Sequence, residues 1–88
     1  MSTPLHTVSS AAGLGLCLAR ATPDAALLLL GDAVYRGLAP LGRPAHALIE
    51  DLSARGLSPA DLAAGVTPVD MKGFLALTVA HSPIIGWP

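Results

Sequence analysis

Continuous apolar runs and helix-forming segments alternate along the chain, and the clearest run covers residues 25–30, directly before Gly31-Asp32. A run of this length without polar alternation is typical of a strand covered on both faces, although periodicity alone does not exclude a buried helix. We predict a central parallel strand here. Asp32 would then stand at its carboxyl end, where the functional crevice of an open α/β sheet lies.

The other segments extend this pattern to the whole chain. We expect further strands at residues 5–8, 45–49 and 66–70, and helices at residues 11–21, 33–38, 50–56, 58–65 and 71–81. Pro68 indicates that the last predicted strand lies at a sheet edge or begins there. The alternating order predicts an α/β fold, with a small parallel sheet and helices on both faces. No linker or repeat divides the chain, so we expect one domain over residues 1–88.

The composition changes this picture in one respect, because the chain is unusually apolar for its size. Of its 88 residues, 52% are hydrophobic and only 12% are charged. An average soluble domain has about 25% charged residues, and so small a domain buries only about 60–65% of its unfolded surface. The excess of apolar surface predicts a subunit of an oligomer.

A membrane span and a nucleic-acid interface are both disfavoured. A spanning helix needs about 20 consecutive apolar residues, and no such run is present. Because the chain starts without the pattern of a signal peptide, we expect a cytoplasmic protein. The net charge of −1, with no basic stripe and only one Trp, one Tyr and one Phe, argues against direct binding of nucleic acid.

Cys17 is the only cysteine, which excludes an intramolecular disulfide and a Cys-x-x-Cys metal site. One interpretation is a small buried hydrophobic residue, since free cysteines are among the most buried residues. The other is a reactive thiolate, which Arg20 would assist from three residues further along the predicted helix. The sequence does not separate the two.

Other residues offer weaker candidates for chemistry. His6, His46 and His81 fall on three separate elements without the spacing of metal ligands, so we expect structural or surface roles and no metal site. Asp32 and Asp70 both follow apolar strands and could face a crevice together, although carboxylates that cap loops are more common. The sequence has no Gly-x-Gly-x-x-Gly, Walker, Gly-x-Ser-x-Gly or His-Glu-x-x-His motif, and we expect no cofactor.

Several segments, in order, resemble the DsrH/TusB family of sulfur-relay subunits. They are residues 5–8, Cys17-Leu18, residues 27–35, residues 47–57, residues 69–81 and Trp87. The resemblance implies a DsrE-like α/β fold and a cytoplasmic heterohexamer with TusC/TusD-like (DsrF/DsrE-like) subunits. It also implies a TusE/DsrC-like sulfur acceptor. Such complexes pass persulfide sulfur towards 2-thiolation of wobble uridine in tRNA, or act in the oxidation of stored sulfur.

The resemblance leaves two hypotheses for this chain. Cys17 matches the position of a cysteine found in some DsrH proteins, and a relay needs one thiolate at each station, so Cys17 is a candidate persulfide carrier. Alternatively, the chain is a non-catalytic scaffold, because the principal cysteine of these complexes belongs to the TusD/DsrE-like subunit. The resemblance therefore does not decide whether this chain itself acts as an enzyme. A third hypothesis, outside the family, is a small self-associating domain without a role in sulfur transfer.

Overall fold

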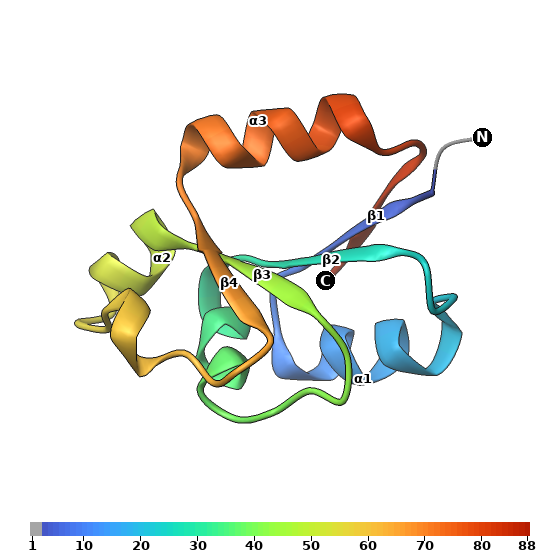
Figure 1. Cartoon of the computed structure of the whole chain (residues 1–88). Helices are drawn as coiled ribbons and strands as arrows, with labels where there is room; N and C mark the ends of the chain where they lie inside the picture. The colour runs from blue at the N-terminus through green and yellow to red at the C-terminus, as the bar shows by residue number, and fades with distance from the viewer. Residues whose placement is uncertain (1–2) are drawn as a thin grey trace.

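The computed structural model describes residues 3–88 and has a single five-stranded sheet (Figure 1). All four strand pairings are parallel, in the order β4-β3-β2-β1-β5. The strands are β1 (Leu5–Val8), β2 (Ala26–Leu29), β3 (Ala45–Leu48), β4 (Val66–Val69) and β5 (Ile84–Trp87). The helices are α1 (Ala11–Arg20), η1 (Gly31–Leu38), α2 (Ile49–Ala54), η2 (Pro59–Asp61) and α3 (Met71–Ala80), of which η1 and η2 are 3₁₀-helices.

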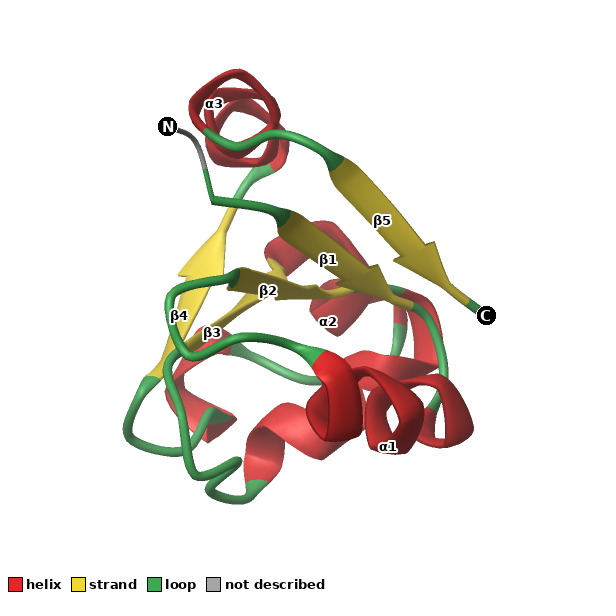
Figure 2. Ribbon diagram, turned by 90° about the vertical axis from the view of Figure 1, so that its right-hand side faces the viewer, coloured by secondary structure: helices red, strands yellow, loops and turns green. Residues whose placement is uncertain are grey.

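The order of the strands explains why helices cover both faces of the sheet. From β1 to β4 each new strand is added on the same side of the previous one. Figure 2 shows α1 below the sheet, and the residue colours of Figure 1 place η1 on the same face. After β4 the chain returns to the opposite edge, and α3 crosses the other face before β5 begins. Crossovers between parallel strands are right-handed, so a reversal of direction moves the connecting helix to the other face. The α/β fold predicted from the sequence is confirmed.

The hydrophobic core lies between the sheet and the layer of α1 and η1. Leu27, Leu28 and Leu29 on β2 are all fully buried, which confirms that the central strand is covered on both faces. Because side chains alternate along a strand, Leu27 and Leu29 point into the core under α1, and Leu28 points towards α3. α2 contributes Leu52 to the core.

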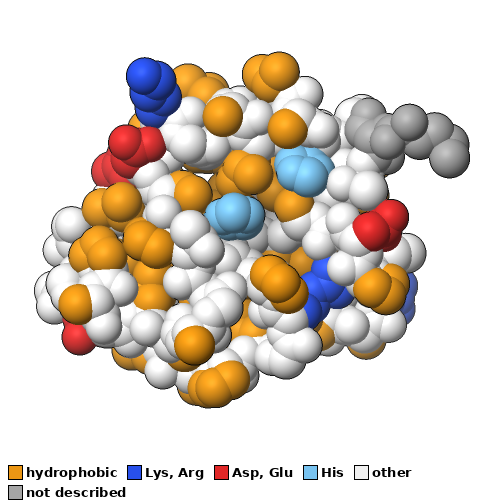
Figure 3. All heavy atoms as spheres, viewed as in Figure 1, with side chains coloured by type: hydrophobic (Ala, Val, Ile, Leu, Met, Phe, Trp, Pro, Cys, Tyr) orange, Lys and Arg blue, Asp and Glu red, His pale blue; other side chains and the backbone are white. Residues whose placement is uncertain are grey.

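The face under α3 is covered much more thinly. No residue of α3 is buried, and Met71, Leu75 and Val79 form an exposed apolar stripe along it. On the neighbouring β5, Ile84 and Ile85 are also exposed. Apolar side chains are visible at many places on the face of the molecule that Figure 3 shows, including the α3 side. Among the helices of residues 3–88, none has the length and hydropathy that a membrane span needs.

The structure corrects the predicted number of strands. Residues 66–70 were expected to hold the last strand, but Ile84–Trp87 forms a fifth strand that pairs with β1. This four-residue run lies between two prolines and has no alternating pattern, so little in the local sequence distinguishes it from a loop. The prediction from Pro68 is confirmed, because β4 lies at the other edge of the sheet.

Candidate functional site

Cys17 lies in α1, a helix that the local sequence favours. Alanine and leucine predominate in this segment, and the Ser10 side chain caps its start by accepting the backbone N–H of Gly13 at 3.0 Å. The helix ends at Arg20, where the Ala21 N–H bonds to the Cys17 carbonyl. Cys17 points into the core and is 0% exposed.

Burial determines the chemical state of this thiol. Desolvation raises the pKa of Cys17, and the positive charge of Arg43 opposes the rise without cancelling it. Because the thiolate is the nucleophilic form, the thiol is poorly reactive in this conformation. Arg20, which the sequence suggested as the assisting cation, is exposed at the end of α1.

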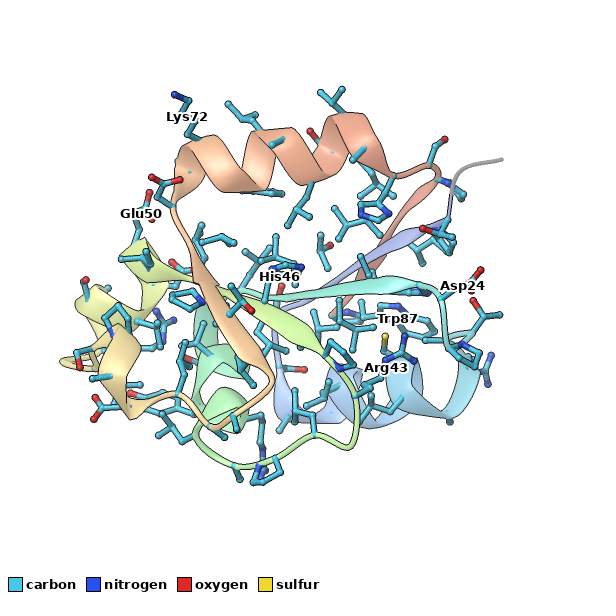
Figure 4. All side chains as sticks on the ribbon, in the orientation of Figure 1. Asp24, Arg43, His46, Glu50, Lys72 and Trp87 are labelled. Atoms are coloured by element: carbon cyan, nitrogen blue, oxygen red, sulfur yellow. The ribbon has the colours of Figure 1, made fainter. Side chains whose placement is uncertain are left out.

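Arg43 occupies the loop before β3 and ties it to the loop after α1. Its Nη2 donates hydrogen bonds of 2.8 Å to the carbonyl oxygens of Thr22 and Ala25. Its Nε is buried and has no hydrogen-bond partner among residues 3–88. Figure 4 shows Arg43 on the same side of the sheet as α1 and Trp87. The guanidinium therefore adds a fixed positive charge to the region around Cys17.

His6 and Trp87 form the second part of this region. The Trp87 indole N–H donates a hydrogen bond of 2.9 Å to Nδ1 of His6, and the ring centroids lie 6.0 Å apart. Since the indole N–H is only a donor, Nδ1 must be the acceptor and the proton of the neutral ring lies on Nε2. Burial, and secondarily Arg43, lowers the pKa of His6.

The other two histidines lie on the opposite face of the sheet. His46 projects from β3 towards the space below α3 (Figure 4), and its buried Nδ1 has no hydrogen-bond partner in the part of the chain that the structure describes. Burial lowers the pKa of His46, and His81 at the end of α3 adds to the effect. Nδ1 of His81 is 3.0 Å from the Thr3 hydroxyl. In the described part of the chain, no group of three His, Cys, Asp or Glu side chains is arranged to hold a metal ion.

The carboxylates at the carboxyl edge of the sheet have structural partners. Asp32 follows β2 as predicted and forms an ion pair of 3.0 Å with Arg55. Asp70 follows β4 and caps α3 by accepting the Gly73 N–H at 2.8 Å. Since β3 lies between β2 and β4, the two carboxylates belong to non-adjacent strands. Asp32 is paired with Arg55 and Asp70 with the backbone of α3, so the two carboxylates do not act on a shared site.

Comparison with protein families now gives the class of the protein. Residues 8–84 match the model of the DsrH-like proteins. The chain belongs to the DsrH family. Members of this family are subunits of sulfur-relay complexes, so this chain is assigned to that general class. A comparison with curated proteins finds no match to it.

The sequence pointed to Cys17, but not to Arg43 or to the hydrogen bond between His6 and Trp87. Arg43 gives no local signal, because its hydrogen-bond partners lie 18 to 21 residues earlier in the chain. The bond between His6 and Trp87 depends on the pairing of β1 with β5. Recognition of the fifth strand would have placed the two side chains on adjacent strands.

Proposed function

We propose that the chain is the architectural subunit of a sulfur-relay complex in which the sulfur-accepting thiolate belongs to a TusD/DsrE-like partner. The supporting observation is the complete burial of Cys17, together with a raised pKa. A thiol in this state cannot meet a donor persulfide without a local opening. Of the two hypotheses, the scaffold fits this geometry better.

The assembly that we propose is a heterohexamer with TusC/TusD-like (DsrF/DsrE-like) subunits. The exposed apolar stripe of α3 supports it, since Leu75 is 59% and Val79 is 87% exposed. Side chains of this kind gathered on one helix indicate a surface that a partner covers. We infer that a related subunit of the complex packs on the stripe.

The relay chemistry requires nothing beyond thiols. In each step the acceptor thiolate attacks the terminal sulfur of the donor persulfide, so that a new S–S bond forms and the old one breaks. The donor leaves as a thiolate and the acceptor becomes the persulfide, with no net oxidation. A TusE/DsrC-like protein takes the sulfur from the complex, for wobble-uridine thiolation of tRNA or for oxidation of stored sulfur. Because a relay of this kind requires thiols that stay reduced, we expect the complex to lie in a reducing compartment such as the cytoplasm.

One observation favours Cys17 as a carrier, which is our second candidate function. The fixed charge of Arg43 lowers the pKa of Cys17 against the effect of burial. If the thiol became exposed while Arg43 stayed in place, the charge would favour the thiolate. The carrier hypothesis therefore requires a conformation in which Cys17 is uncovered.

Intact-mass measurement of the assembled complex tests both candidates. After incubation with a persulfide donor, a carrier gains about 32 Da for each sulfur, and a reductant removes the gain. We expect the gain on the TusD/DsrE-like chain and none on this chain. A Cys17→Ala variant that assembles normally should transfer sulfur at the wild-type rate. A reversible gain on this chain that is lost in Cys17→Ala would instead identify Cys17 as a carrier.

A further inference from the structure

We propose that His6 and Trp87 form a proton-sensitive latch that holds β5 on the sheet. The latch is the single hydrogen bond from the indole Nε1 of Trp87 to Nδ1 of His6, which is 2.9 Å long. It joins β5, the outermost strand, to a buried side chain of the neighbouring strand β1. Both side chains lie on the face of the sheet that carries α1.

The direction of the hydrogen bond makes it sensitive to protonation. Nδ1 of His6 must carry a free lone pair to accept the indole proton. An imidazolium has N–H groups at both positions, so Nδ1 of a protonated ring would present a hydrogen to the indole hydrogen. Protonation therefore replaces an attractive contact with a repulsive one, and His6 has to move away from Trp87 or Trp87 from His6.

The charged and titratable groups around His6 reinforce this effect. Arg43, from the loop before β3, is the cation that acts on His6, and it would repel an imidazolium. Cys17 is the titratable group that α1 contributes to this side of the core, and as a thiol it supplies no negative charge. Within residues 3–88, burial and Arg43 act on the pKa of His6 and no carboxylate does. In this part of the chain, a proton on His6 would thus have no compensating anion while the latch is closed.

Apart from its backbone pairing with β1 and the backbone hydrogen bond from the Leu5 N–H to the Pro83 carbonyl, few contacts besides the latch hold β5 in place. The strand has one neighbour, β1, and three of its four residues are exposed. Only Trp87 packs against the core. One further side-chain hydrogen bond, from the Ser10 hydroxyl to the Pro88 carbonyl oxygen, fixes the end of the strand. Elements with little buried apolar surface open at a lower free energy than the global fold, so the loss of the latch is expected to release β5 first.

Release of β5 would change access to the core. Trp87 packs against the cluster of buried side chains that includes Cys17 and Leu14. When the indole moves away, this side of the cluster opens to solvent. The strands β1 to β4 stay paired, and α1 stays packed against them. The latch therefore couples protonation of His6 to exposure of the core side of α1.

The chain provides its own reporter, because Trp87 is the only tryptophan. We would follow the indole emission of the full-length protein from about pH 7.5 down to pH 5, the range in which histidine titrates. Far-ultraviolet circular dichroism recorded on the same samples reports loss of the whole fold. The variant is His6→Asn, because the Asn oxygen can accept the indole proton but does not titrate. The control is His46→Asn, which removes a histidine from the other face of the sheet.

The proposal predicts a red shift of the wild-type emission below about pH 6.5, with unchanged circular dichroism. His46→Asn should keep this transition, and His6→Asn should lose it. The proposal is overturned if the wild-type emission stays constant until the whole protein unfolds. It is equally overturned if His6→Asn titrates as the wild type does.

The single cysteine gives an independent second readout. At each pH, the labelling rate of Cys17 by a small alkylating reagent is compared between the wild type and His6→Asn, which cancels the pH dependence of the thiol. The ratio of the wild-type rate to the His6→Asn rate should rise as the pH falls. The largest possible rise is about tenfold for each unit by which the His6 pKa in the open state exceeds that in the closed state. A ratio that stays constant over the same range contradicts the latch.

Discussion

The Ser10 hydroxyl donates a hydrogen bond of 2.6 Å to the carbonyl oxygen of Pro88, which joins the start of α1 to the residue after β5. The same Ser10 oxygen accepts the Gly13 N–H and caps the helix. Two segments that lie 78 residues apart in sequence are thus fixed by one side chain. The approach is so close that a Cβ built on Gly13 would overlap the Pro88 carbonyl oxygen.

This contact predicts opposite effects for two glycines of α1. Gly13→Ala should lower the free energy of unfolding by about 1–3 kcal/mol, because the methyl group displaces Pro88 and strains the packing. Gly15 has no atom within 4 Å of the position of an added Cβ. Gly15→Ala should therefore raise the stability by about 0.5–1 kcal/mol through helix propensity. Urea unfolding of the two variants checks the signs, and a stabilised Gly13→Ala would contradict the close contact.

Arg43 should affect both stability and the thiol. Arg43→Met removes hydrogen bonds to two backbone carbonyls, at an expected cost of about 1–3 kcal/mol. Since Arg43 lowers the pKa of Cys17, the variant should also raise that pKa further above its ordinary value. The pH profile of Cys17 alkylation measures this shift. The control is Arg20→Met at an exposed site, which should change the stability by no more than about 0.5 kcal/mol.

The pKa shifts of His6 and His46 predict how stability depends on pH. Both values are lowered in the folded protein, so the unfolded chain binds more protons between the folded pKa and about 6.5. The free energy of unfolding should be constant between about pH 7.5 and 8, below the ordinary pKa of a thiol, and should fall below about pH 6.5, by up to about 1.4 kcal/mol per pH unit for each histidine. Urea unfolding at a series of pH values measures the slope. Replacement of both histidines by Asn should flatten it, and an unchanged slope would exclude them as its source.

Two carboxylates at the carboxyl edge should differ in their contribution to stability. Asp32 is 76% and Arg55 is 23% exposed at the side chain, so Asp32→Asn should cost no more than about 1 kcal/mol. Asp51 accepts the backbone N–H of Gly31 at 2.7 Å in a partly buried position. Asp51→Ala should cost about 1–3 kcal/mol, because the N–H loses its partner. Thermal unfolding of the two variants ranks the effects, and the reverse order would contradict these roles.

The parts of the fold that were predictable are those whose signals are local. The apolar run of β2, the alanine-rich segment of α1 and the Asp70 cap of α3 each depend on residues within a few positions of one another. Apolar runs and caps have this property because they reflect burial and backbone hydrogen bonding of one element. Cys17 was also found locally, as the only cysteine of the chain.

The parts that were missed depend on contacts between distant segments. β5 is a four-residue strand whose partner, β1, lies near the other end of the sequence. The hydrogen bond of Trp87 to His6 spans 81 positions. The state of Cys17 depends on burial under the sheet and on Arg43, which belongs to another loop. The pairing of β5 with β1 and the burial of Cys17 arise from the tertiary structure. The periodicity of the sequence does not predict either of them.

The exposed stripe of α3 allows the proposed assembly to be tested separately from folding. Val79→Asp places a charge at a position that is 87% exposed, so the free energy of unfolding of the isolated chain should change by less than about 0.5 kcal/mol. In a complex that covers this stripe the same charge would be buried without a partner, and co-purification with TusC/TusD-like subunits should be lost. The control is Lys72→Ala, which removes an exposed charge from the same helix and should assemble normally. If Val79→Asp assembles as well as the wild type, the stripe of α3 is not the subunit interface, and the exposed Ile84 and Ile85 of β5 become the surface to test next.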